Sequence, residues 1–427
     1  MVRLPEITQG HFDTAFTLSA LRGVALMIIL ASLAWPFAQF YNDTRLFPLI
    51  CVLSIAPATR ALLSPRLAGF VQQLDYRRDF AVQLSAKIVA LLVAATLAIY
   101  TGSYWAIAAG TVVTPLTMIA VSYLLAPYRP RFSLSEKDVF IPFLGWTTGA
   151  QIVTSLSWQC DRLILGRFTS HGALGAFSLA GDLAAIPDQV LIKSLVRPLV
   201  SAFSLVRQDL TRLREAYSKA TCTILAMGLP LVLGLGLLAD PVVRLMLGGR
   251  WLVAVPYLQW LALSFIPALF VAPLSSLAMA LDSAHIFLRQ SVIEFCIKLP
   301  LVAAGVIWFG VTGVIAARFA STITMAFVSM MFVRALVGTP LFQQILTPWR
   351  VLVSAGVLAA ALLALRPELH DLQGLELGIN LALVAASTFG LYLAVLFFLW
   401  HHTGRPAGIE DTAHRFFVGW WRRRTAS

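Results

Sequence analysis

Long apolar runs without a charged residue constrain this chain more than any other feature of its sequence. The run from Ile379 to Trp400 contains no Asp, Glu, Lys or Arg and is long enough to cross a bilayer as a helix. Only helices and closed barrels satisfy their backbone polar groups inside lipid, and unbroken apolar runs select helices. Of the 427 residues, 59% are hydrophobic and 12% are charged, about half the charged fraction of soluble domains. We therefore expect an all-α integral membrane protein.

The apolar runs predict about 12 transmembrane helices joined by short loops. Prolines recur inside these runs, so several of the helices are expected to bend. The polar stretch 207–219 is expected to form a short amphipathic helix at the membrane interface. The expected spans are 16–41, 46–64, 80–100, 104–126, 140–166, 176–203, 221–239, 253–281, 292–309, 312–333, 351–365 and 379–400.

Basic residues are concentrated in every second loop of this arrangement. One set of loops carries Arg66, Arg77, Arg78, Arg129 and Arg131, and the opposite set is poorer in Lys and Arg. The positive-inside rule places the richer set in the cytoplasm, and an even number of spans then puts both termini there. The net charge of +12 favours contact with anionic membrane lipids. No module or basic groove for nucleic acid occurs, so we expect no nucleic-acid partner.

Matching segments about 208 residues apart predict an internal repeat. Leu74-Asp75 matches Leu281-Asp282, and Tyr100-Thr101-Gly102 matches Trp308-Phe309-Gly310. The matched spans lie an even number of crossings apart, which predicts two parallel-repeat lobes. The expected parts are an N-terminal lobe over 1–135, a C-terminal lobe over 136–338, and a further helix pair with a basic tail over 339–427. The second lobe opens with a helical hairpin that the first lobe lacks.

Basic residues inside or at the ends of apolar runs are candidates for function, because an unpaired charge in lipid is costly. These cations outnumber the anions, and a cationic cavity suits a phosphate or a carboxylate. For each cation, the alternative is a side chain that extends to the membrane surface. The candidate anion contacts are Arg22, Arg60, Lys87, Lys193, Arg197, Lys298 and Arg318.

Acidic residues stand beside basic ones where two apolar runs join, within Leu156–Leu183. Asp161, Arg162 and Asp182, together with Glu294, are candidates for coupling or structural roles. Asp161 and Arg162 could pair with each other at a helix end. Glu294 and Lys298 lie four residues apart and could pair on one helix face.

Signatures of catalysis are missing from the sequence. It contains no P-loop, GxSxG or HExxH motif and no clustered histidines apart from His401-His402. A membrane glycan ligase or acyltransferase would need a catalytic His or acid in a large external loop, and the expected external loops are short. Cys51, Cys160, Cys222 and Cys296 each stand alone in an apolar run, which favours neither a disulfide nor a zinc site. We expect a non-enzymatic protein without a cofactor or metal.

Two stretches, Gly145–Pro187 and Pro230–Ala262, carry the most distinctive sequence. Their core, DRLILGRF from Asp161 to Phe168 followed by LGAFSLA from Leu174 to Ala180, resembles the polysaccharide transporters related to Wzx-type flippases. These belong to the multidrug/oligosaccharidyl-lipid/polysaccharide exporter superfamily. Members commonly have an opening helix pair that this chain lacks, in agreement with the gap in the repeat.

The resemblance implies a flippase of the bacterial inner membrane. Its substrate would be an undecaprenyl-diphosphate-linked oligosaccharide, moved by alternating access for exopolysaccharide, capsule or O-antigen assembly. Its partners would be membrane lipids and polysaccharide polymerase or export machinery. A cation-coupled multidrug exporter and a lipid II flippase of the same superfamily are the alternatives.

Overall fold

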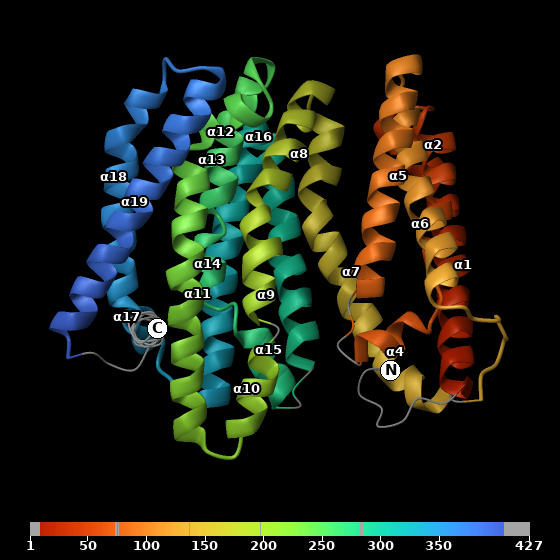
Figure 1. Ribbon diagram of the computed structural model, residues 1–427, viewed down its shortest axis with the longest axis horizontal. Helices are drawn as coiled ribbons and strands as arrows, with labels where there is room; N and C mark the ends of the chain where they lie inside the picture. Colours follow the sequence, from red (N-terminus) through yellow and green to blue (C-terminus); the bar gives the residue numbers. More distant parts are fainter. Residues whose placement is uncertain are drawn as a thin grey trace, which may run out of the picture. The chain divides into compact units, whose positions relative to one another are not determined.

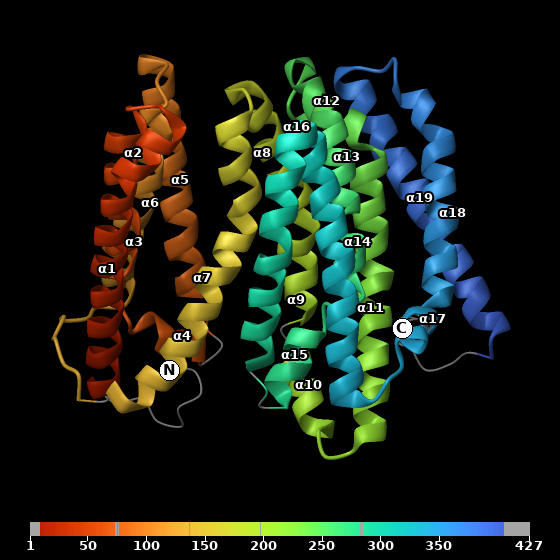
Figure 2. The ribbon, with the colours of Figure 1, turned by 180° about the vertical axis from the view of Figure 1, so that it is seen from behind.

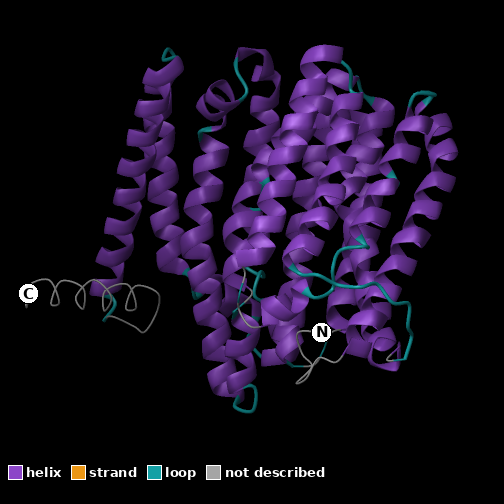
Figure 3. Ribbon diagram, turned by 45° about the vertical axis from the view of Figure 1, so that its right-hand side comes forward, coloured by secondary structure: helices purple, strands orange, loops and turns teal. Residues whose placement is uncertain are grey.

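The computed structural model describes residues 9–72, 75, 77–135, 137–196, 198–281, 283 and 285–404. Helices dominate this part of the chain, and it contains no strand (Figure 3). Among the described residues, nine helical stretches are long and apolar enough to cross a membrane. The all-α membrane class expected from the sequence is confirmed, and the count of 12 spans stays a prediction.

The chain divides into two compact units, Met1–Thr147 and Thr148–Ser427, and helix α7 (Lys137–Phe168) passes through the boundary. The first unit contains α1 (Gln9–Tyr41), α2 (Leu46–Leu53), α3 (Ile55–Arg60), α4 (Leu67–Gln72), α5 (Arg77–Thr101) and α6 (Trp105–Leu125). The second unit contains α8 (His171–Ala184), η1 (Asp188–Ile192), α9 (Lys193–Val196), α10 (Leu199–Val206), α11 (Leu210–Leu237), α12 (Ala239–Met246), η2 (Gly249–Ala254), α13 (Val255–Leu263), α14 (Ile266–Leu269), α15 (Leu274–Ala280), α16 (His285–Val337), α17 (Leu341–Leu346), α18 (Trp349–Leu365), η3 (Arg366–Leu369) and α19 (Gly374–His402). The three-part division expected from the sequence stays a prediction.

Helix α16 is a hairpin of two helices that turns at Gly310. Gly310 has φ +59° and ψ −134°, a left-handed conformation that glycine adopts without steric cost. Gly305 and Gly313 on either side of the turn let the two backbones meet, because a Cβ on Gly305 would lie 2.5 Å from the Gly313 carbonyl oxygen. The two teal halves of α16 lie side by side in Figure 2.

Two backbone features recur at the spacing of the expected repeat. The turn between α5 and α6 uses Gly102 at φ +56°, 208 residues before Gly310. The Asp75 amide donates to the Phe70 carbonyl at 3.0 Å, and the Ser283 amide donates to the Ala278 carbonyl at 2.8 Å. The two hairpins therefore share a turn glycine and a helix-end hydrogen bond at the expected spacing, and the repeat itself stays a prediction.

Two of the expected spans in the second unit are interrupted rather than continuous. The expected span 176–203 is divided among α8, the π-helix η1, α9 and α10, and the expected span 253–281 is divided among α13, α14 and α15. The breaks fall beside Pro187, Pro267 and Pro273, because proline lacks an amide hydrogen and clashes with the preceding turn.

The prediction of a separate amphipathic helix at 207–219 was wrong. Helix α11 instead begins at Leu210 and continues without a break to Leu237. The Asp209 side chain caps this helix by accepting hydrogen bonds from the amides of Thr211 and Arg212. The polar stretch is therefore the first part of a long helix whose later turns are apolar.

The second unit buries its apolar side chains in three clusters. One joins α11 to the blue helices α18 and α19 of Figure 1, where the Tyr392 hydroxyl donates to the Ala226 carbonyl at 2.9 Å. A second, which includes Leu165, Phe177 and Leu258, joins α7, α8, α13 and α16. The third joins α10, α11, α15 and the end of α16. The second cluster packs α7 against α16. Polar and charged side chains of these two helices also contact one another.

Replacing Gly305 with Ala should destabilise the α16 hairpin, because the new Cβ would force the two backbones apart. We expect a loss of about 1–3 kcal/mol of stability, seen as a lower midpoint of thermal unfolding for the detergent-solubilised protein. Gly356→Ala in α18 is the matched control, since a Cβ there meets nothing within 4 Å. Equal midpoints for the two variants would contradict the close approach.

Candidate functional site

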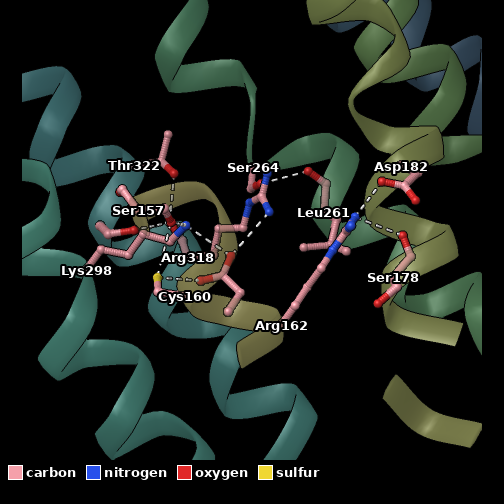
Figure 4. Close-up of polar contacts among 12 residues, drawn as sticks. Ser157, Cys160, Arg162, Ser178, Asp182, Leu261, Ser264, Lys298, Arg318 and Thr322 are labelled. Atoms are coloured by element: carbon pink, nitrogen blue, oxygen red, sulfur yellow. Dashed lines mark hydrogen bonds and ion pairs between the residues drawn. The ribbon is translucent and has the colours of Figure 1, made fainter. Parts of the chain in front are cut away.

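Helices α7 and α16 are joined by a ladder of polar contacts that repeats every three or four residues. The hydroxyls of Thr154 and Ser291 lie 3.1 Å apart, and one turn on the Ser157 hydroxyl donates to Glu294 Oε1 at 3.2 Å. The Lys298 ammonium then donates to the Ser157 carbonyl at 2.7 Å (Figure 4). The two hydroxyl contacts both join residues 137 positions apart in the sequence, so the two helices run parallel and in register here.

The Asp161 carboxylate ends this ladder and binds two cations. Its Oδ2 atom lies 3.1 Å from Lys298 Nζ and 3.4 Å from Arg318 Nη1. The side chains of Asp161, Lys298 and Arg318 are 2%, 9% and 15% exposed, so water screens these ion pairs little. The Cys160 thiol lies 3.4 Å from the other carboxylate oxygen, Oδ1. Asp161 thus holds both halves of the α16 hairpin to α7.

Arg318 lines two small cavities of the second unit. One, of about 170 Å³, is lined by Gln290, Glu294, Lys298, Arg318 and Thr322 among others. The other, of about 150 Å³, is lined by Asp161, Arg162, Asp182, Gln189 and Arg318 among others. The Arg318 guanidinium also lies over the Phe265 ring, 5.1 Å from its centroid, within the range of a cation–π contact. Arg318 is therefore the cation that can contact a solute from either cavity.

Arg162 and Asp182 form a second, more exposed ion pair. Arg162 Nη2 lies 2.5 Å from Asp182 Oδ1 and also donates to the Ser178 carbonyl at 3.2 Å. The Asp182 side chain is 66% exposed. The pair ties α7 to α8 beside the smaller cavity.

Both pairings weighed from sequence spacing were wrong. Asp161 binds Lys298 and Arg318 rather than Arg162, because successive residues of a helix point in different directions. Lys298 binds Asp161 rather than Glu294, whose carboxylate accepts from Ser157 instead. Lys298 and Glu294 thus each contact α7 instead of pairing with each other on α16.

The other predicted anion contacts are not part of this cluster. Arg22 on α1, Arg60 on α3 and Lys87 on α5 belong to the first unit and are exposed. The backbone of Lys193 lies in α9, and nothing is described of its side chain. Arg197 lies outside the described residues.

Several hydroxyl and amide side chains of the site are absent from the prediction. Ser157, Gln290, Thr322 and Ser329 contact or flank the charged residues. A signal exists in the sequence, since Ser157 precedes Asp161 by four residues and Thr322 follows Arg318 by four. Polar residues at this spacing share one face of an otherwise apolar helix, so they mark the face that avoids lipid.

These features define a multi-pass helical membrane protein with the fold of known exporters. The lipid II flippase MurJ, in an inward closed conformation, is similar with a TM-score of 0.70 and 14% identity, over 93% of this chain and 86% of that chain. An inward-facing multidrug resistance MATE family transporter of the MOP superfamily is similar with a TM-score of 0.63 and 15% identity, over 77% of this chain and 82% of that chain. At these identities the likeness shows the fold alone.

The model of the family described as Polysaccharide biosynthesis protein matches residues 1–256, and the chain belongs to this family. The lipopolysaccharide biosynthesis protein WzxC of Escherichia coli K12 is 25% identical, over 82% of this chain and 72% of WzxC. The teichuronic acid biosynthesis protein TuaB of Bacillus subtilis 168 is 24% identical, over 92% of this chain and 83% of TuaB. The succinoglycan biosynthesis transport protein ExoT of Rhizobium meliloti 1021 is 26% identical, over 45% of this chain and 40% of ExoT. The family resemblance noted in the sequence is confirmed.

Asp161→Asn should destabilise the second unit strongly, because the largely buried Lys298 and Arg318 both lose the carboxylate that they bind. Removing one partner of a buried ion pair costs about 3–5 kcal/mol. The control is Asp182→Asn, which breaks a solvent-exposed pair worth at most about 1 kcal/mol. Thermal unfolding of both variants in detergent checks the difference. Midpoints that fall equally would show that Asp161 is not the junction of this bundle.

Proposed function

We propose that this protein moves a lipid-linked oligosaccharide across the bacterial inner membrane during polysaccharide biosynthesis. The substrate class is an oligosaccharide on undecaprenyl diphosphate, destined for exopolysaccharide, capsule or O-antigen. The family match and the names of WzxC, TuaB and ExoT support a role in polysaccharide biosynthesis, and the name of ExoT adds transport. Both termini would lie in the cytoplasm, with polymerase or export machinery as partners.

The main support for this proposal is the largely buried Arg318 guanidinium, which lines two cavities within an apolar helical bundle. A guanidinium binds phosphate and carboxylate oxygens through two parallel hydrogen bonds. Arg318 and Lys298 would together offer such a site to the diphosphate or to an acidic sugar. Thr322, Gln290 and Ser329 would add neutral hydrogen-bonding groups of the kind that sugar hydroxyls use.

In the conformation described, the Asp161 carboxylate binds both Lys298 and Arg318. An entering anion therefore has to compete with this carboxylate. Displacement of the Asp161 carboxylate would release Lys298 and Arg318 for that anion. The same release would loosen α7 from the α16 hairpin, because the ion pairs join these helices. Asp161 would thereby couple anion binding to helix movement.

The cavity volumes fit a closed state of such a cycle. Both are below the roughly 300–1,000 Å³ typical of sites for drug-sized ligands, at about 170 and 150 Å³. They can hold several waters or one phosphate-sized group, but not an oligosaccharide. Substrate entry therefore requires the helices that line Arg318 to separate.

Arg318→Gln should lower export of surface polysaccharide at least about tenfold, because the anion loses its charged contact while Lys298 still neutralises Asp161. Polysaccharide on the cell surface is measured in a strain that relies on the variant, at matched protein level. Arg318→Lys keeps the charge without the planar fork and should export at an intermediate level. Arg334→Gln, an exposed change at the end of α16, is the control. Full export by Arg318→Gln would remove the residue from the transport path.

The same strains separate the proposed substrate from the alternatives. Loss of a polysaccharide flippase leaves lipid-linked repeat units accumulated inside the cell, whereas loss of a multidrug exporter changes drug susceptibility. Loss of a lipid II flippase stops cell-wall synthesis. Normal surface polysaccharide with raised drug susceptibility would overturn the proposal.

A further inference from the structure

The segment that follows α6 in the first unit is extended and pinned by side-chain hydrogen bonds. The Ser64 hydroxyl donates to the Ala126 carbonyl at 2.7 Å, and the Ser64 amide donates to the Ser122 hydroxyl at 3.3 Å. Further along, the Ser133 amide donates to the Thr17 hydroxyl at 2.9 Å. The segment from Ala126 to Ser133 is therefore fixed against α1 and against the turn that follows α3.

Tyr128 is the central anchor of this segment. Its side chain packs under the Phe16 ring, with centroids 5.6 Å apart, and its hydroxyl donates to Asp13 Oδ1 at 2.6 Å. Burial, reinforced by the Asp13 carboxylate, raises the pKa of Tyr128 to about 12. The hydroxyl therefore remains protonated and keeps its hydrogen bond at any physiological pH.

The pinned segment borders a hollow of about 470 Å³ that carries three arginines, Arg66, Arg129 and Arg131. All three are exposed, and no carboxylate is among the described residues that line the hollow. Arg66 donates to the Pro127 carbonyl at 2.7 Å, which orients its guanidinium. Within the described part of the chain, none of the three forms an ion pair. The hollow thus concentrates positive charge on a rigid backbone.

Large apolar side chains stand exposed beside these arginines. Leu124 at the end of α6 and Phe132 in the pinned segment are each 77% exposed. The positive-inside rule places this end of the unit at the cytoplasmic membrane surface. Exposed apolar side chains next to a basic hollow at the membrane surface favour a ligand that carries a phosphate on an apolar chain. They do not favour a soluble phosphate.

We propose that this hollow binds the phosphate group of a membrane lipid, with Arg66, Arg129 and Arg131 as its contacts and with Leu124 and Phe132 against the acyl or prenyl chain. The inference goes beyond the transport function and does not depend on it. Two sources offer the same chemistry, the headgroup of a bulk anionic phospholipid and the diphosphate of a polyprenyl carrier. Binding of the carrier would place a docking site for substrate outside the second unit.

The test is direct binding to the purified full-length chain in neutral detergent, with soluble short-chain probes. Farnesyl diphosphate represents the carrier, dioctanoyl phosphatidylglycerol represents the bulk lipid, and farnesol and dioctanoyl phosphatidylcholine are the uncharged and zwitterionic controls. The variant Arg129→Gln/Arg131→Gln leaves the Arg66 contact to Pro127 in place, so it should fold. The control variant Lys219→Gln/Arg334→Gln removes two exposed charges from the same predicted side of the membrane.

Each basic residue near an anionic headgroup contributes about 1 kcal/mol, a factor of about five in affinity. We expect the double Arg variant to bind the phosphate probes at least about tenfold more weakly and the control variant to bind them normally. Preference for farnesyl diphosphate supports the carrier, and equal binding of phosphatidylglycerol supports a general lipid site. Equal affinities for the double Arg variant and the control variant, or equal binding of farnesol, would overturn the proposal. Because no transport is measured, this result is independent of the Arg318 export test.

Discussion

The carboxylate of Asp161 is the contact on which the second unit depends. It is buried, it binds Lys298 and Arg318 on the two halves of α16, and it follows by one turn the Ser157 that bonds Glu294. Desolvating an unpaired charge costs several kcal/mol, so each of these ions holds the others in place. The helices around them can be apolar and still be held in register, because this alignment of α7 on α16 places Asp161 against Lys298 and Arg318.

The membrane class, the positions of most helices and the family follow from the sequence because they depend on local patterns. Apolar runs are set by bilayer thickness, and glycine marks the turns at Gly102 and Gly310. The partner of each charge does not follow, because it depends on which helices pack together. Asp161 and Arg162 are neighbours in sequence, yet they bind different elements. Sequence spacing predicted the nearest residue of opposite charge as the partner. In the structure, helix packing instead brings together the residues that leave no buried charge unpaired.

Helix continuity is also a tertiary property. The stretch 253–281 contains no charged residue, but its prolines divide it into α13, α14 and α15. Phe265, at the first break, lies against Arg318. Likewise the π-helix η1 follows Pro187 and precedes α9. Broken helices expose backbone carbonyls that lipid cannot satisfy, so they occur where protein or a polar cavity surrounds them. The breaks thus lie beside the two cavities for the same reason that the charges do.

The balance of charge differs between the interior and the membrane surface. Within the second unit, Asp161 and Glu294 offset Lys298 and Arg318, so the cluster as a whole is close to neutral. The net charge of +12 therefore resides mainly elsewhere, including the exposed arginines of the first unit. A neutral interior lets the bundle close without an uncompensated charge, whereas a permanently cationic passage would retain its anion. Under the proposed function, displaceable ion pairs inside and exposed cations at the surface would let an anionic lipid be attracted first and released afterwards.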